Sequence, residues 1–383
     1  MNYSAIDYHK KNSFISTCNE QGERIAEAKI CGNDPSAFAR YFARLGEGPG
    51  KVVVEACWNW SWLHDVLSEL ESIEEVVLAH PYKTRVIAEA QIKSDKLDAR
   101  ILSQLLRTKL IARAHVPSKQ TRQRRLLLRQ RMFWVRLRTM VRNRVHALLA
   151  RQHGLTLPQR ADHFGSGGMK FLRSVQLEGS EAKLLGQDLE VLEQLELQIK
   201  QSEKEIRRQM GQEPEVERLQ SIPGVGILLS AVIAAEFDGA ERFQSNTKLW
   251  AYCGLAPSTR SSDSHTWHGP LLFRCNKWLR WAFIEAAWIG IQHSAYFAAI
   301  YQRQLTRGKI PNKAIVVVAR RLCEIAWKVL REKRSFSAQP PPRQANPFSR
   351  SPSRHSGGAY CKQYRLAPSL SIGDRESNPL PCG

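Results

Sequence analysis

The feature that most restricts the fold of this chain is a short apolar run, Val52 to Val54, inside the segment KVVVEA. Three β-branched residues in succession favour a strand, and a run without polar alternation is typical of a strand that is buried on both faces. Together with the predicted helices and strands around it, the run indicates an α/β domain. The run ends in an acid, Glu55, at the carboxyl end of the predicted strand.

The segments around this run predict a defined order of elements. Upstream, the stretches YSAID, NSFISTC and RIAEAKI are separated by polar turns and predict a meander of three strands. A helix follows, capped by Asp34 with Pro35 in its first turn and closed by Gly46. Downstream, SWLHDVLSELES predicts a helix and EEVVLAH a strand. The order β-β-β-α-β-α-β-α resembles that of an RNase H-like domain.

Four acids lie at the ends of predicted strands or at the start of a predicted helix. Asp7 ends the first predicted strand, Glu55 ends the buried one, and Asp95 and Asp98 open a helix in KSDKLDARIL. Residues three apart lie on one helix face, so this pair presents two carboxylates to one point. If the two strands are neighbours, all four acids converge, and their repulsion is relieved only by cations. Oxygen ligands suit Mg²⁺ or Mn²⁺, and two such ions about 4 Å apart can clamp an in-line phosphoryl transfer.

Positive charge is concentrated in the middle of the chain. The sequence holds 57 Lys and Arg against 36 Asp and Glu, a net charge of +21, which points to a polyanionic partner. Residues 99–161 contain 16 basic residues, 14 of them arginines, and no acid, and they predict a long basic helix after Pro117. Solvated charge runs usually mix both signs, so the pattern favours a phosphate-facing surface, of DNA or RNA. The predicted backbone contacts are Arg124, Arg125, Arg129, Arg136, Arg138, Arg142 and Arg144.

Four parts are predicted along the chain: a catalytic domain at 1–115, a basic helix and connector at 116–212, a mainly α domain at 213–334 and a disordered tail at 335–383. The segment 181–210 predicts a second long helix, either a coiled-coil seam between protomers or a hairpin packed on the basic helix. In the α domain, SIPGVGILLSAVIAAE resembles a helix-hairpin-helix element. Gly224 and Gly226 allow a tight turn that either binds phosphate through free amides or only joins two helices.

Other classes of protein fit the sequence poorly. The amino end is too polar for a signal peptide, and the longest apolar run, VGILLSAVIAA, is too short to span a bilayer. Eight cysteines without a CxxC pair argue against a disulfide framework and a zinc site. We therefore expect a cytoplasmic protein with reduced thiols and no membrane partner.

Several motifs together resemble those of a known family. AID at Asp7, VVVEACWNW around Glu55 and KSDKLDA at 93–99 are similar to the DEDD motif of insertion-sequence transposases related to Piv-like DNA invertases. The resemblance continues to about residue 334 through Gly254, Leu255, Pro257, Ser262, Gly269, Leu279 and Arg280. It implies a RuvC-like, RNase H-fold amino-terminal domain, a long helical connector and a mainly α carboxyl-terminal transposase domain.

The resemblance also implies an activity and partners. Asp7, Glu55, Asp95 and Asp98 would bind the metal, and Ser262 would attack a phosphodiester and conserve its energy in a protein–DNA ester. The protein would cut and rejoin donor and target DNA to mobilise an insertion sequence. A structured noncoding guide RNA, nucleic-acid contact at Arg280, and a homodimer or tetramer are further implications.

Two other functions stay open. A metal-dependent, structure-specific nuclease of the Holliday-junction type would use water as nucleophile and would not need Ser262. A degenerate, non-catalytic nucleic-acid-binding copy is the second alternative. It draws on four departures from the family pattern: Asp263 and Ser264 where relatives carry small glycines, and Phe273 and Cys275 where they carry a lysine and a glycine.

Overall fold

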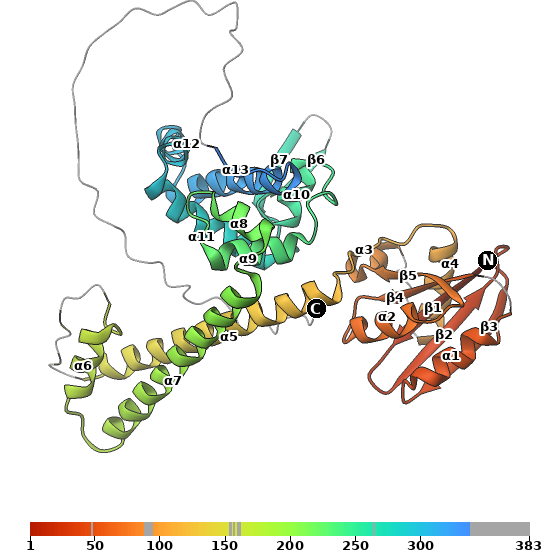
Figure 1. The fold of residues 1–383 in the computed structure, drawn as a ribbon, viewed down its shortest axis with the longest axis horizontal. Helices are drawn as coiled ribbons and strands as arrows, with labels where there is room; N and C mark the ends of the chain where they lie inside the picture. Colours follow the sequence, from red (N-terminus) through yellow and green to blue (C-terminus); the bar gives the residue numbers. More distant parts are fainter. Residues whose placement is uncertain are drawn as a thin grey trace, which may run out of the picture. The chain divides into compact units, whose positions relative to one another are not determined.

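The computed structural model describes residues 1–46, 49–87, 95–152, 155, 158, 162–262 and 265–337 of the 383-residue chain. These residues form two compact units, one from Met1 to Val116 and one that begins at Pro117 (Figure 1). The predicted disordered tail lies outside the described residues from position 338 onward.

The first unit contains one five-stranded sheet in the order β3-β2-β1-β4-β5. The meander β1–β2–β3 is antiparallel, and β4 and β5 continue the sheet in parallel with β1. Along the chain, the elements follow the predicted order β-β-β-α-β-α-β-α. The strands are β1 (Asn2–Tyr8), β2 (Asn12–Cys18), β3 (Arg24–Cys31), β4 (Gly50–Glu55) and β5 (Ile73–Ala79).

Helices cover both faces of this sheet, as the apolar run in β4 requires. One face is covered by α1 (Pro35–Ala43) and α2 (Trp60–Ser68), whose buried side chains pack on Val52 and Val54. On the other face, α4 (Asp95–Arg107) packs Leu102 and Leu106 on Val53. The predicted cap of α1 is confirmed, because the Asp34 side chain accepts a hydrogen bond from the Ser36 amide at 3.0 Å. Helix α3 (Pro81–Ile87), which the sequence reading did not identify, joins β5 to the segment before α4.

The second unit begins with a hairpin of two long helices. The predicted basic helix is α5 (Lys119–Leu149), and the predicted second helix is α7 (Gly179–Met210); α6 (Ser166–Ser174) lies between them. The leucine face of α7 packs on α5 around Val145 and Leu148 within the same chain. Of the two interpretations of the second helix, the structure shows the hairpin.

The rest of the second unit is a helical domain with one small hairpin of strands. Its helices are α8 (Pro214–Gln220), α9 (Ile227–Phe237), α10 (Asn246–Tyr252), α11 (Lys277–His293), α12 (Ala295–Thr306) and α13 (Pro311–Arg331). Helix α11 has one apolar face, since Leu279, Ala282, Phe283, Ala286 and Ala287 are all fully buried. Strands β6 (Pro257–Ser262) and β7 (His265–Leu271) form an antiparallel pair that the sequence reading missed.

The sequence predicted reduced cysteines and no membrane-spanning helix. The six cysteines among the described residues are all free thiols. Within the described ranges, every helix is too short or too polar to cross a membrane.

Candidate active site

Two of the four predicted acids lie side by side at the edge of the sheet. Strands β1 and β4 are parallel neighbours and pair as far as Ile6 and Val54, so Asp7 and Glu55 follow at adjacent positions. Side chains alternate between the faces of a strand. Because Ala5 and Val53 are buried beneath α4, Asp7 and Glu55 are directed to the α4 side of the sheet.

The other two acids come from the first turn of α4. This helix begins at Asp95, and Asp98 lies one turn before Leu102, which packs on the sheet. Asp98 therefore shares the sheet-facing side of the helix. Lys93 and Ser94 of the motif KSDKLDA lie outside the described residues. The structure thus places Asp7 and Glu55 on the face of the sheet that α4 covers, and Asp95 and Asp98 in the first turn of that helix.

Helix α4 is held in place by contacts with the antiparallel edge of the sheet. Arg100 forms a bidentate ion pair with Glu27 of β3, with nitrogen–oxygen distances of 2.5 and 2.9 Å. The side chain of Gln104 donates to the carbonyl of Gly22 at 2.7 Å. Hydrogen bonding from Arg100 lowers the pKa of Glu27 to about 2, so the ion pair persists at neutral pH.

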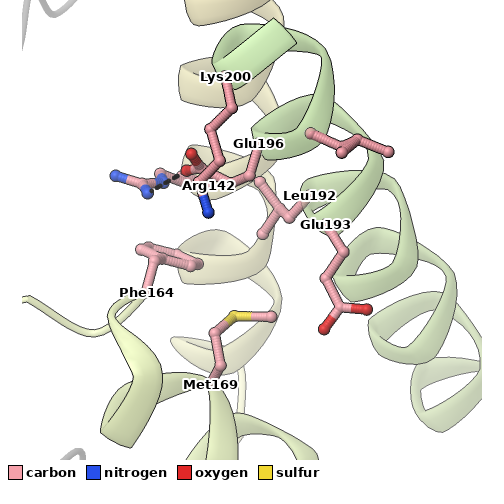
Figure 2. A pocket seen from close by; sticks show the side chains of 8 residues that line it. Arg142, Phe164, Met169, Leu192, Glu193, Glu196 and Lys200 are labelled. Carbon is pink, nitrogen blue, oxygen red and sulfur yellow. Dashed lines mark hydrogen bonds and ion pairs between the residues drawn. The ribbon is translucent and has the colours of Figure 1, made fainter.

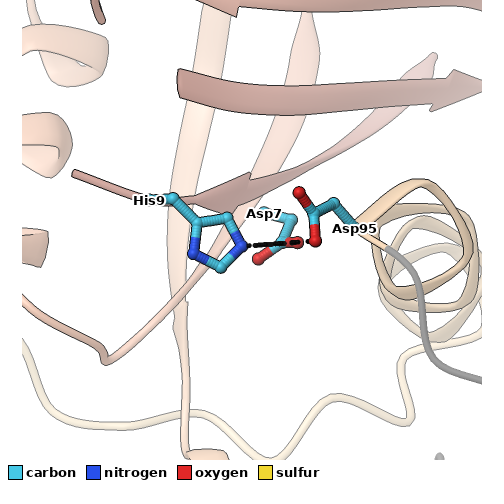
Figure 3. Close-up of side chains that lie close together, drawn as sticks. All are labelled: Asp7, His9 and Asp95. Carbon is cyan, nitrogen blue, oxygen red and sulfur yellow. Dashed lines mark hydrogen bonds and ion pairs between the residues drawn. The ribbon is translucent and has the colours of Figure 1, made fainter. Parts of the chain in front are cut away.

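A histidine joins this group of acids. His9 Nε2 lies 3.2 Å from a carboxylate oxygen of Asp7 and 3.6 Å from one of Asp95, and Figure 3 shows the three side chains directed toward one another. One ligand atom from each lies within 4.8 Å of the other two. The sequence reading missed His9, although the pattern Asp-x-His at the exit of β1 offered a signal for it.

Burial and electrostatic repulsion both disfavour the ionised form of Asp7. Burial raises the pKa of Asp7, His9 opposes this shift, and repulsion from Asp95 and Asp98 raises the pKa further. These shifts show that Asp7 lies near both helix acids. The oxygen-rich donor set with one imidazole nitrogen fits a divalent ion such as Mg²⁺ or Mn²⁺.

A hollow of about 270 Å³ opens beside Asp7 and Glu55. Its wall includes Tyr8 and Trp58, whose rings stack with centroids 6.2 Å apart. Burial and the nearby Glu55 raise the pKa of the Cys57 thiol to about 11, so this lining residue stays protonated at neutral pH. A neutral thiol is a poor ligand for a hard cation, so Cys57 fits a site for such an ion less well than the carboxylates beside it.

Ser262 belongs to the second unit, where it is the last residue of β6 and is exposed. Asp263 and Ser264, two of the departures from the family pattern, lie outside the described residues. Ser262 pairs across the hairpin with His265, whereas its neighbour Ser261 pairs with Thr266 and shares a hydrogen bond of 3.0 Å with it.

The predicted arginine contacts on α5 have partners within the protein. Arg138 and Arg142 share Glu196 of α7 at 3.0 and 2.9 Å, and Figure 2 shows Arg142 between this acid and Phe164 beside a hollow of about 270 Å³. The other predicted contacts are equally engaged: Arg124 with Glu213, Arg125 and Arg129 with Glu236, Arg144 with Asp188, and Arg136 with the ring of Trp278. Residues 99–161 contain no acid, but acids from α7, α9 and the turn before α8 balance part of their positive charge.

The three remaining predicted contacts differ in their surroundings. Gly224 adopts a φ of +90° and lies so close to α11 that a Cβ atom would overlap the carbonyl oxygen of Ala286, so helix packing alone accounts for this glycine. Gly226 is exposed at the amino end of α9. Arg280 donates to the carbonyl of Leu272 and so anchors the base of the β6–β7 hairpin.

Comparison with known proteins connects both units to one family. A family model for DEDD-type transposases of the IS110 kind matches residues 5–153, and a model for the transposase IS116/IS110/IS902 family matches residues 216–302. The first match contains all four acids, and the second contains Ser262.

Individual relatives agree with these models. The chain is 30% identical to the IS116 insertion-element protein of Streptomyces clavuligerus over 149 residues, 38% of this chain and 37% of the relative. It is 30% identical to the IS110 protein of Streptomyces coelicolor over 32% of this chain and 30% of that relative, so these matches span about a third of each. Against the transposase of IS1328 from Yersinia enterocolitica, identity is 25% over 85% of this chain and 96% of the relative. The chain belongs to the DEDD-type insertion-sequence transposases.

Proposed function

We propose that the protein cuts and rejoins DNA strands to move an insertion sequence, with the acids of the first unit as its metal site and Ser262 as its nucleophile. The observation that carries this proposal is the placement of Asp7 and Glu55 at neighbouring strand ends, on the face of the sheet that α4 covers. Family membership supplies the substrate class, since the relative from Yersinia enterocolitica is named as a transposase.

The proposed metal ligands are Asp7, Glu55, Asp95 and Asp98. A divalent ion bound there would supply positive charge to the oxygens of the scissile phosphate. The protein's own part is to hold the carboxylates close together, which the Glu27–Arg100 contact supports by fixing α4. The raised pKa of Asp7 is consistent with such a site, because burial and repulsion from Asp95 and Asp98 penalise its ionised form and a bound cation would offset both.

The proposed role of Ser262 is attack on the phosphodiester. Its hydroxyl would form a bond to phosphorus while the bond to the leaving sugar oxygen breaks, which conserves the energy for rejoining. The exposed position at the end of β6 leaves this hydroxyl accessible to a large substrate. Ser261 offers a matched control, because it is the adjacent serine but its hydroxyl is bonded to Thr266.

The decisive experiment measures protein-linked DNA on a plasmid that carries the element ends, with Mg²⁺ and the full chain. We expect wild type and Ser261→Ala to form the covalent adduct, and Ser262→Ala and Asp98→Asn to lose it. Cleavage by Ser262→Ala without an adduct would establish the nuclease alternative instead. If wild type does not cleave the plasmid with any metal tested, the result supports the non-catalytic alternative.

The α5 arginines remain proposed contacts to nucleic acid, with a specific electrostatic basis. Glu196 and Glu236 each serve two arginines, so each group keeps one positive charge in excess. A phosphate could bind to that excess without separating the helices. Arg138→Ala should weaken binding of DNA or guide RNA and flatten its dependence on salt, which filter binding at several salt concentrations would measure.

The remaining proposals follow from the family. We propose donor and target DNA as substrates, a structured noncoding RNA as guide, and a homodimer or tetramer as the assembly. The proposed division of labour keeps residues 1–115 as the catalytic domain, 116–212 as the connector and 213–334 as the transposase domain, followed by the tail at 335–383.

A further inference from the structure

The hairpin β6–β7 exposes an unusual set of side chains. Residues 259–262 and 265–270 are all exposed, and Trp267 keeps 59% of its surface accessible to solvent. Figure 1 shows the two strands projecting from the helices of their domain. A two-stranded hairpin with no packed face is only marginally stable by itself. A large aromatic side chain at such a place contributes little to folding and is available for binding.

The strand register sorts these side chains onto two faces. Arg260 lies opposite Trp267, and Ser262 lies opposite His265. Because side chains alternate along each strand, these four residues share one face, which we call the serine face. The rings of His265 and Trp267 lie 5.8 Å apart on it. The opposite face holds Thr259 with His268 and Ser261 with Thr266, both joined by side-chain hydrogen bonds.

The chemistry of the serine face fits an unpaired nucleic-acid strand. Aromatic rings stack on exposed bases, and a neighbouring arginine can bind the phosphate that follows. The local charge agrees, because the sequence from Pro257 to Arg280 has four basic residues against one acid, Asp263. Paired bases in a duplex are already stacked on one another, so their ring faces are not available to Trp267.

We propose that the serine face binds an unpaired segment of DNA, with Trp267 stacked on a base and Arg260 in contact with the adjacent phosphate. Ser262 on the same face then lies beside the backbone of the bound strand. This inference deepens the proposed function and rests on it for the role of Ser262. It specifies an unpaired strand as the form of DNA that is bound, and it names Trp267 and Arg260 as the residues that would select this form.

The test measures binding of the full chain to a single-stranded DNA oligonucleotide that contains 2-aminopurine, whose fluorescence falls when the base stacks. Duplex DNA and RNA of the same sequence serve as separate arms. Loss of one base stack weakens binding roughly 5- to 150-fold, and we expect this loss for Trp267→Ala together with reduced quenching. Trp267→Phe should retain most of the binding. His268→Ala is the matched control, since it removes a ring from the next position on the opposite face.

Equal affinity of Trp267→Ala and His268→Ala for single-stranded DNA would overturn the inference. A loss confined to the RNA arm would overturn the assignment to DNA. Asp7→Asn separates this inference from the proposed function, because it should abolish the covalent adduct and keep the Trp267-dependent binding. If wild type forms the adduct while Trp267→Ala binds normally, only the inference fails. If Trp267-dependent binding occurs without any adduct, only the proposed function fails.

Discussion

Replacement of Glu236 by glutamine tests whether the α5 arginines stabilise the fold. Glu236 is 4% exposed on α9 and accepts a hydrogen bond from Arg129 at 3.2 Å and from Asn276 at 2.9 Å, while Arg125 lies 3.4 Å away. The carboxylate thus connects α5, α9 and the amino end of α11. Glutamine preserves its size but removes the negative charge that two arginines share.

The expected loss can be worked out from these contacts. Removing one partner of a buried ion pair costs about 3–5 kcal/mol, because the remaining charge stays desolvated. The side chain of Arg129 is 33% exposed, so water compensates part of its loss, and the glutamine carbonyl still accepts one hydrogen bond. We therefore expect the free energy of unfolding of the second unit to fall by about 3 kcal/mol. For a unit of this size, that corresponds to a decrease of about 6–12 °C in Tm.

Circular dichroism during thermal unfolding measures this change. The control is Glu193→Gln, which breaks a pair with Arg173 whose side chains are 49% and 59% exposed, and which should cost about 0–1 kcal/mol. If both variants unfold at the same temperature, Glu236 does not stabilise the helices and the arginines are not structural. A large loss in Glu236→Gln alone would show that they have a structural role before any nucleic acid binds.

Three further predictions concern other parts of the molecule. Asp7→Asn should raise the Tm of the metal-free protein at neutral pH, because the raised pKa of Asp7 means that its ionised form is penalised in the folded state. In thermal unfolding, added Mg²⁺ should then stabilise wild type more than the variant. The pKa of Glu27 is lowered, so its pair with Arg100 adds stability above about pH 4.5, and this stability is lost as the pH falls toward about 2. Urea unfolding at a series of pH values should show the loss in wild type and not in Glu27→Gln. Gly224→Ala should destabilise the protein by about 2–5 kcal/mol through backbone strain and overlap with α11, and an unchanged urea midpoint would contradict this packing.

The first unit was predictable because its signals are local. The apolar run of β4 ends directly in Glu55, and the first strand, predicted to end at Asp7, ends one residue later at Tyr8, so strand ends and acids are read from a few neighbouring residues. Parallel pairing of β1 and β4 then places both acids at one edge. His9 was missed because a single histidine after a strand has no periodic pattern.

The second unit was less predictable because its key contacts are distant in sequence. Arg125 and Glu236 are 111 positions apart, and Arg138 and Glu196 are 58 apart, so the pairing of the arginines depends on how α7 and α9 pack on α5. The β6–β7 hairpin was missed for a different reason. Its strands are exposed on both faces, so they lack the alternation of apolar and polar residues that identifies a half-buried strand.

The pairing register of the exposed β6–β7 hairpin decides which serine shares a face with Trp267. A slip of one residue in strand pairing would turn Ser262 to the opposite side and bring Ser261 to the face of Trp267. The described residues 259–262 and 265–270 are all exposed, so no apolar layer among them fixes the register. The alignment rests on the side-chain hydrogen bonds of the opposite face and on the base, where the Leu272 amide donates to Ala256 at 3.0 Å and Arg280 donates to the Leu272 carbonyl. Ser262 therefore shares a face with Trp267 only while this register is kept, so the choice between the two hydroxyls is made by strand alignment and not by strand composition.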